Sequence, residues 1–174
     1  MYPDVILLNG TGSAGKTSLA KELQELLSIQ YLNFSIDSVL YALPPTDLRK
    51  MIEGNHINRS GYDYGQLTEG YHNSVKGLLE AGCKLIVDNA WINEDEINAL
   101  EKTLNGYHVV RVKVMCQLDI CIARELARGD RAIGLAESEY PLVHQFMNYD
   151  VTVDTSDIQP KEAAIQLLKQ LELC

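Results

Sequence analysis

Residues 4–17, DVILLNGTGSAGKT, join a short apolar run to a glycine-rich loop that ends in Lys16-Thr17. The loop fits the pattern GxxxxGK[ST], and leucines at helical spacing follow it over residues 16–27. In such a loop, glycines let backbone N–H groups turn toward phosphate oxygens, and the following helix points its positive end at them. We therefore expect a nucleoside triphosphate to bind here, against Gly10, Thr11, Gly12, Ser13, Ala14, Gly15, Lys16 and Thr17.

The last two residues of the loop carry the most specific expectations. Lys16 is expected to reach the β- and γ-phosphates, and the Thr17 hydroxyl is expected to coordinate Mg²⁺. The sequence thus predicts ATP and Mg²⁺ as cofactors.

The same glycines allow a second interpretation. Gly10, Gly12 and Gly15 also satisfy GxGxxG, and Asp37 lies about where a dinucleotide-binding fold places its ribose-binding acid. An NAD-binding Rossmann oxidoreductase is therefore an alternative. Lys16-Thr17 argues against it, because the dinucleotide fingerprint gives this pair no role, and the short chain leaves little room for a substrate domain. A nucleotide-binding module that senses without transferring a group is a third possibility.

The rest of the chain alternates short apolar strands with amphipathic helices. Strands are predicted at 4–9, 31–36, 84–88, 108–115 and 151–154, and helices at 16–27, 66–81, 94–104, 118–127 and 160–171. The strands are continuously apolar, which is typical of a sheet covered on both faces. The pattern predicts an α/β fold, with a doubly wound five-stranded parallel sheet and helices on both faces, and the glycine-rich loop makes it a P-loop domain. We expect one domain over residues 1–174, with a mobile loop at 55–65.

Two aspartates follow predicted strands, at the edge of the sheet where ligands bind in this fold class. Asp88 ends the strand KLIVD and is expected beside Thr17 and the metal ion. Asp37 follows the second strand and is expected to accept the proton of an acceptor hydroxyl. Either acid could instead cap a helix, and which of the two serves as base and which lies at the metal is left open.

Three arginines gather in an otherwise acidic chain. Arg124 and Arg128 share a helix face at i, i+4 spacing, and Arg131 follows the break at Gly129. We expect residues 124–136 to form a lid whose arginines offset the charge that develops during transfer. The alternative is a solvated helix face on which Glu125 pairs with Arg128.

Several other polar and aromatic residues are weaker candidates. His144 could contact an acceptor but is more often structural, and Asp154-Thr155 could lie near the nucleotide base. An acceptor pocket could be lined by Trp91, Tyr41, Tyr62, Tyr64 and Tyr71, although some of these are expected in the core.

Charge and cysteine content exclude some functions. The net charge of -9 and the pI near 4.8 argue against a nucleic-acid coat protein or a binder of anionic membranes. No segment suits a signal peptide or a membrane span, and the four cysteines form no CxxC pair, which favours reduced thiols in the cytoplasm. The expected partner is a small hydroxylated substrate, and the oligomeric state is left open.

The chain resembles the chloramphenicol phosphotransferase-like P-loop kinases over nearly its whole length. The shared residues are the phosphate loop at 9–17, Ile36-Asp37-Ser38, Val87-Asp88, the arginine block 124–131 with Gly134 and Ala136, Val143-His144, Tyr149-Asp150 and Val153-Asp154-Thr155. The resemblance implies transfer of the γ-phosphoryl group of ATP to a small-molecule hydroxyl. It also implies that Asp37 is the catalytic base and that Lys16, Thr17 and the lid arginines bind ATP.

The resemblance says less about the acceptor. Residues 42–71, which form much of the acceptor pocket in this fold, do not match the family pattern. The resemblance therefore implies a small hydroxylated molecule as the acceptor, but it does not identify that acceptor as chloramphenicol. Antibiotic resistance, self-protection and metabolism all remain possible physiological roles.

Overall fold

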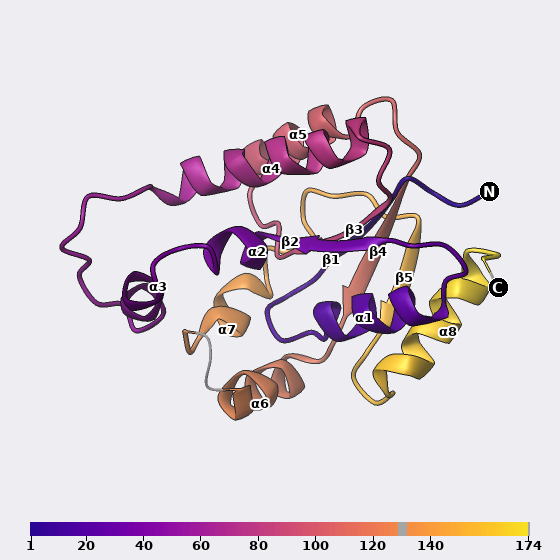
Figure 1. Cartoon of the computed structure of the whole chain (residues 1–174). Helices are drawn as coiled ribbons and strands as arrows, with labels where there is room; N and C mark the ends of the chain where they lie inside the picture. The colour runs from indigo at the N-terminus through magenta and orange to yellow at the C-terminus, as the bar shows by residue number, and fades with distance from the viewer. Residues whose placement is uncertain (129–131, 174) are drawn as a thin grey trace.

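The computed structural model describes residues 1–128 and 132–173. Five parallel strands form one sheet in the order β2-β3-β1-β4-β5 (Figure 1). They are β1 (Val5–Asn9), β2 (Leu32–Ser35), β3 (Leu85–Asn89), β4 (Val109–Met115) and β5 (Val151–Asp154). The predicted five-stranded parallel sheet is confirmed.

Helices cover both faces of this sheet, as predicted. Helices α1 (Lys16–Leu26) and α8 (Pro160–Gln170) lie on one face, and α4 (Tyr64–Glu80) and α5 (Glu94–Thr103) lie on the other (Figure 1). Each face of the sheet has its own hydrophobic core, and alternate residues of β1 pack into the two. Ile6 and Leu8 pack with residues of α1 and α8, and Leu7 packs with residues of α4 and α5. All five residues of β1 are buried, which explains why this strand has no polar alternation.

The second strand ends one residue earlier than predicted. The sequence suggested a strand over 31–36, but Ile36 already begins α2 (Ile36–Leu40). The side chains of Ser35 and Ser38 form a capping box there, which satisfies backbone N–H groups that an extended strand would leave for a neighbour. Asp37 therefore lies in the first turn of a helix rather than at a strand end.

Four further helices differ from the sequence prediction. Helices α3 (Pro45–Ile52) and α7 (Leu135–Glu139) were not predicted, and α6 (Leu118–Arg128) includes residues assigned to the lid. Helix α4 begins at Tyr64 rather than residue 66, because the Asp63 carboxylate accepts the N–H of Gln66 and caps the helix. The predicted loop is correspondingly shorter.

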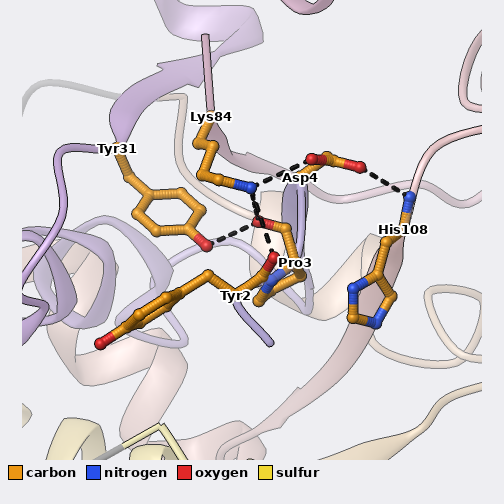
Figure 2. Close-up of polar contacts among 6 residues, drawn as sticks. All are labelled: Tyr2, Pro3, Asp4, Tyr31, Lys84 and His108. Atoms are coloured by element: carbon orange, nitrogen blue, oxygen red, sulfur yellow. Dashed lines mark hydrogen bonds and ion pairs between the residues drawn. The ribbon is translucent and has the colours of Figure 1, made fainter. Parts of the chain in front are cut away.

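Polar contacts tie the N-terminal segment to the amino ends of the strands, away from the site described below. Lys84 Nζ donates to the carbonyl oxygen of Pro3 and to Asp4 Oδ1, each over 3.0 Å (Figure 2). Asp4 Oδ2 accepts the backbone N–H of His108, and Tyr31 donates its hydroxyl to Pro3. The His108 N–H and the Lys84 ammonium lower the pKa of Asp4. These contacts hold the N-terminal segment against the residues that precede β2, β3 and β4.

The described cysteines form no disulfide. Cys83, Cys116 and Cys121 are free thiols, and Cys174 lies outside the described residues. Among the helices described, none has the length and apolar character needed to cross a bilayer.

Candidate functional site

A cavity of about 480 Å³ opens at the carboxyl ends of the strands. Five residues of the glycine-rich loop reach it, together with Asp37 of α2 and Asp88 of β3. Helices α2, α3, α6 and α7 gather at the same end of the sheet (Figure 1). The loop residues that line the cavity are Gly12, Ser13, Gly15, Lys16 and Thr17.

The glycine-rich loop needs its glycines for two different reasons. Gly15 has a φ of 87°, in the left-handed region that glycine adopts without strain. At Gly10 the reason is space, since a Cβ there would lie 2.4 Å from the carbonyl oxygen of Val114 in β4. The loop therefore lies against β4 so closely that no side chain fits between them.

Lys16 is buried and folded back over its own loop. Its Nζ donates to the carbonyl oxygens of Gly10, at 2.6 Å, and Thr11, at 2.9 Å. These carbonyls hold the ammonium group within the phosphate-binding loop.

An acidic side chain also contacts this loop. The backbone N–H of Gly12 donates to Oε2 of Glu139, the last residue of α7, over 2.7 Å. Glu139 thus places a carboxylate against a loop whose N–H groups suit anionic oxygens.

Asp88 and Thr17 bring a carboxylate and a hydroxyl group to the cavity. Asp88 is buried and lies in register with Leu8 of β1 and Ser35 of β2, while Thr17 lies in the first turn of α1. Across the described residues, no cluster of three or more histidine, cysteine or acidic side chains forms a metal cage. Mg²⁺ usually takes only one or two protein oxygens and completes its shell with phosphates and water, so this donor set fits it.

Comparison with known proteins agrees with this geometry. Residues 3–172 match the family described as chloramphenicol phosphotransferase-like protein. The chain belongs to this family. A Mycobacterium tuberculosis (strain H37Rv) relative whose name assigns it as an O-phosphotransferase is 29% identical, with 98% of this chain and 83% of the relative covered.

Solved structures show the same fold at low sequence identity. A gluconokinase from Sinorhizobium meliloti superposes with a TM-score of 0.69 at 17% identity, covering 98% of this chain and 93% of that one. The Deinococcus radiodurans tunicamycin resistance protein superposes at 0.67 and 20%, covering 99% and 98%. Because it belongs to the phosphotransferase-like family and shares this fold, the chain is a P-loop small-molecule kinase, and the NAD-linked alternative is not favoured.

Two of the three predicted lid arginines belong to the described residues. Arg128 lines the cavity, and Arg131 lies outside the described residues. Glu125 does not serve as the solvated ion-pair partner considered from the sequence; it is buried and accepts the backbone N–H groups of Gly134, at 2.8 Å, and Ala136, at 2.9 Å. Its carboxylate fastens the start of α7 to α6.

Arg124 supports the loop from behind rather than lying on a flap. Its Nη2 donates to the carbonyl oxygen of Thr155 over 2.8 Å, and its Nη1 contacts Cys116 Sγ at 3.3 Å. The Thr155 hydroxyl in turn donates to the carbonyl oxygen of Ala14 over 2.6 Å. Arg124 and Thr155 therefore fix the floor of the phosphate loop to the ends of β4 and β5.

His144 and Trp91 belong to the supporting structure of this phosphotransferase. His144 Nδ1 lies 2.8 Å from the Tyr149 hydroxyl, and that hydroxyl accepts Asn9 Nδ2 at 2.8 Å. Burial, with the nearby charges of Lys113 and Lys16, lowers the pKa of His144 to about 4. Trp91 is fully buried, and its backbone N–H donates to Asn9 Oδ1. Neither lines the cavity.

The aromatic candidates divide between core and pocket. Tyr71 is fully buried and stacks on Phe34, so it belongs to the core. Tyr41 and Tyr64 line the cavity, while Tyr62 does not. Burial raises the pKa of Tyr64, and the negative charge of Glu96 adds to that effect.

The apolar wall of the cavity and two of its acids were not predicted from the sequence. Glu96 and Glu139 line the cavity, and no sequence pattern singled them out. The apolar wall could have been found, since Leu48, Met51 and Ile52 have the i, i+3, i+4 spacing of a helix face. With α2 included, that wall consists of Ile36, Leu40, Tyr41, Leu48, Met51 and Ile52.

Proposed function

We propose that the protein transfers the γ-phosphoryl group of Mg²⁺-bound ATP to a hydroxyl of a small molecule. One observation carries the proposal: the phosphate loop, Asp37, Asp88 and Arg128 line the same cavity as an apolar wall. A loop suited to phosphates and a wall suited to an organic acceptor therefore face the same space.

The triphosphate is proposed to bind along the loop from Gly10 to Thr17. Its oxygens would accept backbone N–H groups there, and Lys16 would leave its two carbonyl partners to reach the β- and γ-phosphates. Thr17 and Asp88 would hold Mg²⁺, which when bound neutralises charge on the β- and γ-phosphate oxygens. Arg128, which lines the cavity, and Arg131 are proposed to complete the nucleotide contacts, while Arg124 supports the loop from behind.

Asp37 is proposed as the catalytic base. As the acceptor oxygen bonds to the γ-phosphorus, the hydroxyl proton passes to the Asp37 carboxylate, and the bond from that phosphorus to the ADP oxygen breaks. ADP leaves with the electron pair. Lys16, Arg128 and Arg131 would offset the charge that spreads over the transferring group, which is where most of the acceleration arises in phosphoryl transfer.

Residues 1–174 are proposed to act as one catalytic domain. The free thiols of the described cysteines support a cytoplasmic location.

A screen for ATP-dependent phosphorylation tests the proposal. Purified protein is incubated with Mg·ATP and a panel of hydroxylated metabolites and antibiotics, and mass spectrometry looks for the gain of one phosphoryl group. Product that disappears when EDTA removes the metal supports the proposal. ATP hydrolysis with no acceptor modified across the panel would favour the non-transferring module instead.

A further inference from the structure

The acceptor side of the cavity differs in charge from the nucleotide side. Among the described lining residues, the cationic side chains are Lys16, in the phosphate loop, and Arg128, at the end of α6. Four carboxylates line the same cavity: Glu139 of α7 contacts the phosphate loop, and the others are Asp37 from α2, Asp88 from β3 and Glu96 from α5. The proposed function gives Asp37 and Asp88 roles at the reacting groups and leaves Glu96 without one.

Glu96 is half-buried, and its contact with the protein is weak. Its Oε1 accepts Asn89 Nδ2 over 3.3 Å, and none of the ion pairs between described residues includes it. Burial raises the pKa of its carboxyl group. A half-buried carboxylate with one long hydrogen bond from a neutral amide gains from a cation that binds beside it.

The surroundings of Glu96 define the rest of the ligand. Tyr64 lies close enough for the charge of Glu96 to raise its pKa, and Ile92 of the loop before α5 lines the same cavity. The apolar side chains of Leu48, Met51 and Ile52, from α3, line this cavity as well. A ligand that matches this side combines a compact apolar or aromatic body with a positive charge.

From this arrangement we infer that the acceptor is an apolar amino alcohol, and that Glu96 determines specificity by pairing with its ammonium group. The inference rests on the proposed function, because it assigns the acceptor of the same site. Anionic acceptors are disfavoured, since the acceptor side holds carboxylates and no described cationic side chain.

Three alcohols of similar size test this inference. Phenylalaninol carries an ammonium group, N-acetylphenylalaninol is neutral, and phenyllactic acid is anionic. Binding to the wild-type protein is measured by calorimetry in the presence of Mg²⁺ and a non-hydrolysable ATP analogue, and phosphoryl transfer is measured separately with Mg·ATP. We expect phenylalaninol to bind about tenfold more tightly than its N-acetyl form, corresponding to one well-placed ion pair, and the acid to bind weakest.

Two variants test whether Glu96 is responsible for the preference for phenylalaninol over its N-acetyl form. Glu96→Gln keeps the shape and a partner for Asn89, and it should reduce the preference for phenylalaninol to within about twofold. Glu94→Gln, an exposed residue in the first turn of the same helix, is the matched control and should keep the wild-type preference. Thermal unfolding of both variants establishes that they are folded.

The outcomes separate this inference from the proposed function. A wild-type protein that binds phenylalaninol no better than its N-acetyl form, or a Glu96→Gln variant that keeps the preference, overturns the inference. In either case, transfer to a neutral alcohol would leave the proposed function standing. Preferential, Glu96-dependent binding of the amine without transfer to any acceptor supports the assignment of the pocket and counts against the phosphotransferase proposal.

Discussion

The Glu139 carboxylate accepts the backbone N–H of Gly12 over 2.7 Å, so an acid from α7 occupies part of the phosphate loop. A phosphate oxygen and this carboxylate oxygen compete for the same donor and repel each other. ATP binding is therefore expected to displace Glu139 from Gly12, with α7 moving relative to the loop.

Glu139→Gln is predicted to tighten ATP binding. The neutral amide removes the repulsion and is a weaker acceptor for the Gly12 N–H, so the Kd for Mg·ATP should fall by about threefold to tenfold. Calorimetric titration measures the effect. Glu137→Gln, exposed on the same helix, should change the Kd little, and an unchanged Kd in Glu139→Gln would mean that the carboxylate does not compete.

Asp37→Asn is predicted to abolish most transfer while nucleotide binding persists. The amide cannot accept the acceptor proton, so kcat should fall by about 10²–10⁴-fold. Rapid-quench assays with saturating ATP measure the rate, and calorimetry measures the Kd for the nucleotide. Asp119→Asn is the matched control, because Asp119 is an exposed acid in the first turn of α6. Full turnover in Asp37→Asn would remove the base assignment.

Lys16→Met is predicted to impair both binding and rate. It removes the ammonium group that Gly10 and Thr11 hold in the loop, so both the Kd for ATP and kcat should worsen, each by about tenfold or more. Lys21→Met, on the exposed side of α1, should leave both values near wild type. Unaltered ATP kinetics in Lys16→Met would contradict its proposed contact with the phosphates.

Gly10→Ala is predicted to destabilise the fold. A methyl group at this position would lie 2.4 Å from the Val114 carbonyl oxygen, and moving loop and strand apart should cost about 1–3 kcal/mol of unfolding free energy. Gly77→Ala is the control, because its methyl group meets nothing within 4 Å and lies inside α4. That variant should gain about 0.5–1 kcal/mol, since alanine favours helix. Urea unfolding distinguishes the two, and equal stabilities would contradict the close contact.

His144 is predicted to make stability depend on pH below neutrality. Its pKa is about 4 in the folded protein, against an ordinary value of 6.5, so the unfolded chain binds the proton first as pH falls. The stability that neutral His144 contributes is present above about pH 6.5 and is lost as pH falls toward about 4. Because the ring is only half-buried, the effect should be modest.

The measurement compares thermal midpoints near neutral pH and at about pH 5. His144→Gln should lose less stability over this range than the wild type, because its side chain does not titrate. His56→Gln, in the exposed loop before α4, should follow the wild-type profile. A His144→Gln profile that is parallel to the wild type would show that His144 does not contribute.

The parts of the site that could be predicted from sequence are those fixed by backbone geometry. The loop from Gly10 to Thr17 and the acid Asp88 follow from strand, turn and helix signals close together in the chain. Glu139 and Glu96 could not be predicted, because each reaches the cavity through the packing of a helix distant in sequence from the loop. Asp37 was placed at the right edge of the sheet but in the wrong element, because the sequence analysis did not recognise the cap at Ser35.

Helix α3 contributes three residues to the cavity wall but no buried residue to the protein. Residues 53–63, which connect it to α4, contain no helix or strand beyond the turn that ends α3. Substitutions in this segment should leave the unfolding free energy nearly unchanged, since little core packing depends on it. Substitutions in this surface segment can therefore change the acceptor specificity over evolution. The phosphate loop, which is packed against the sheet, need not change with it.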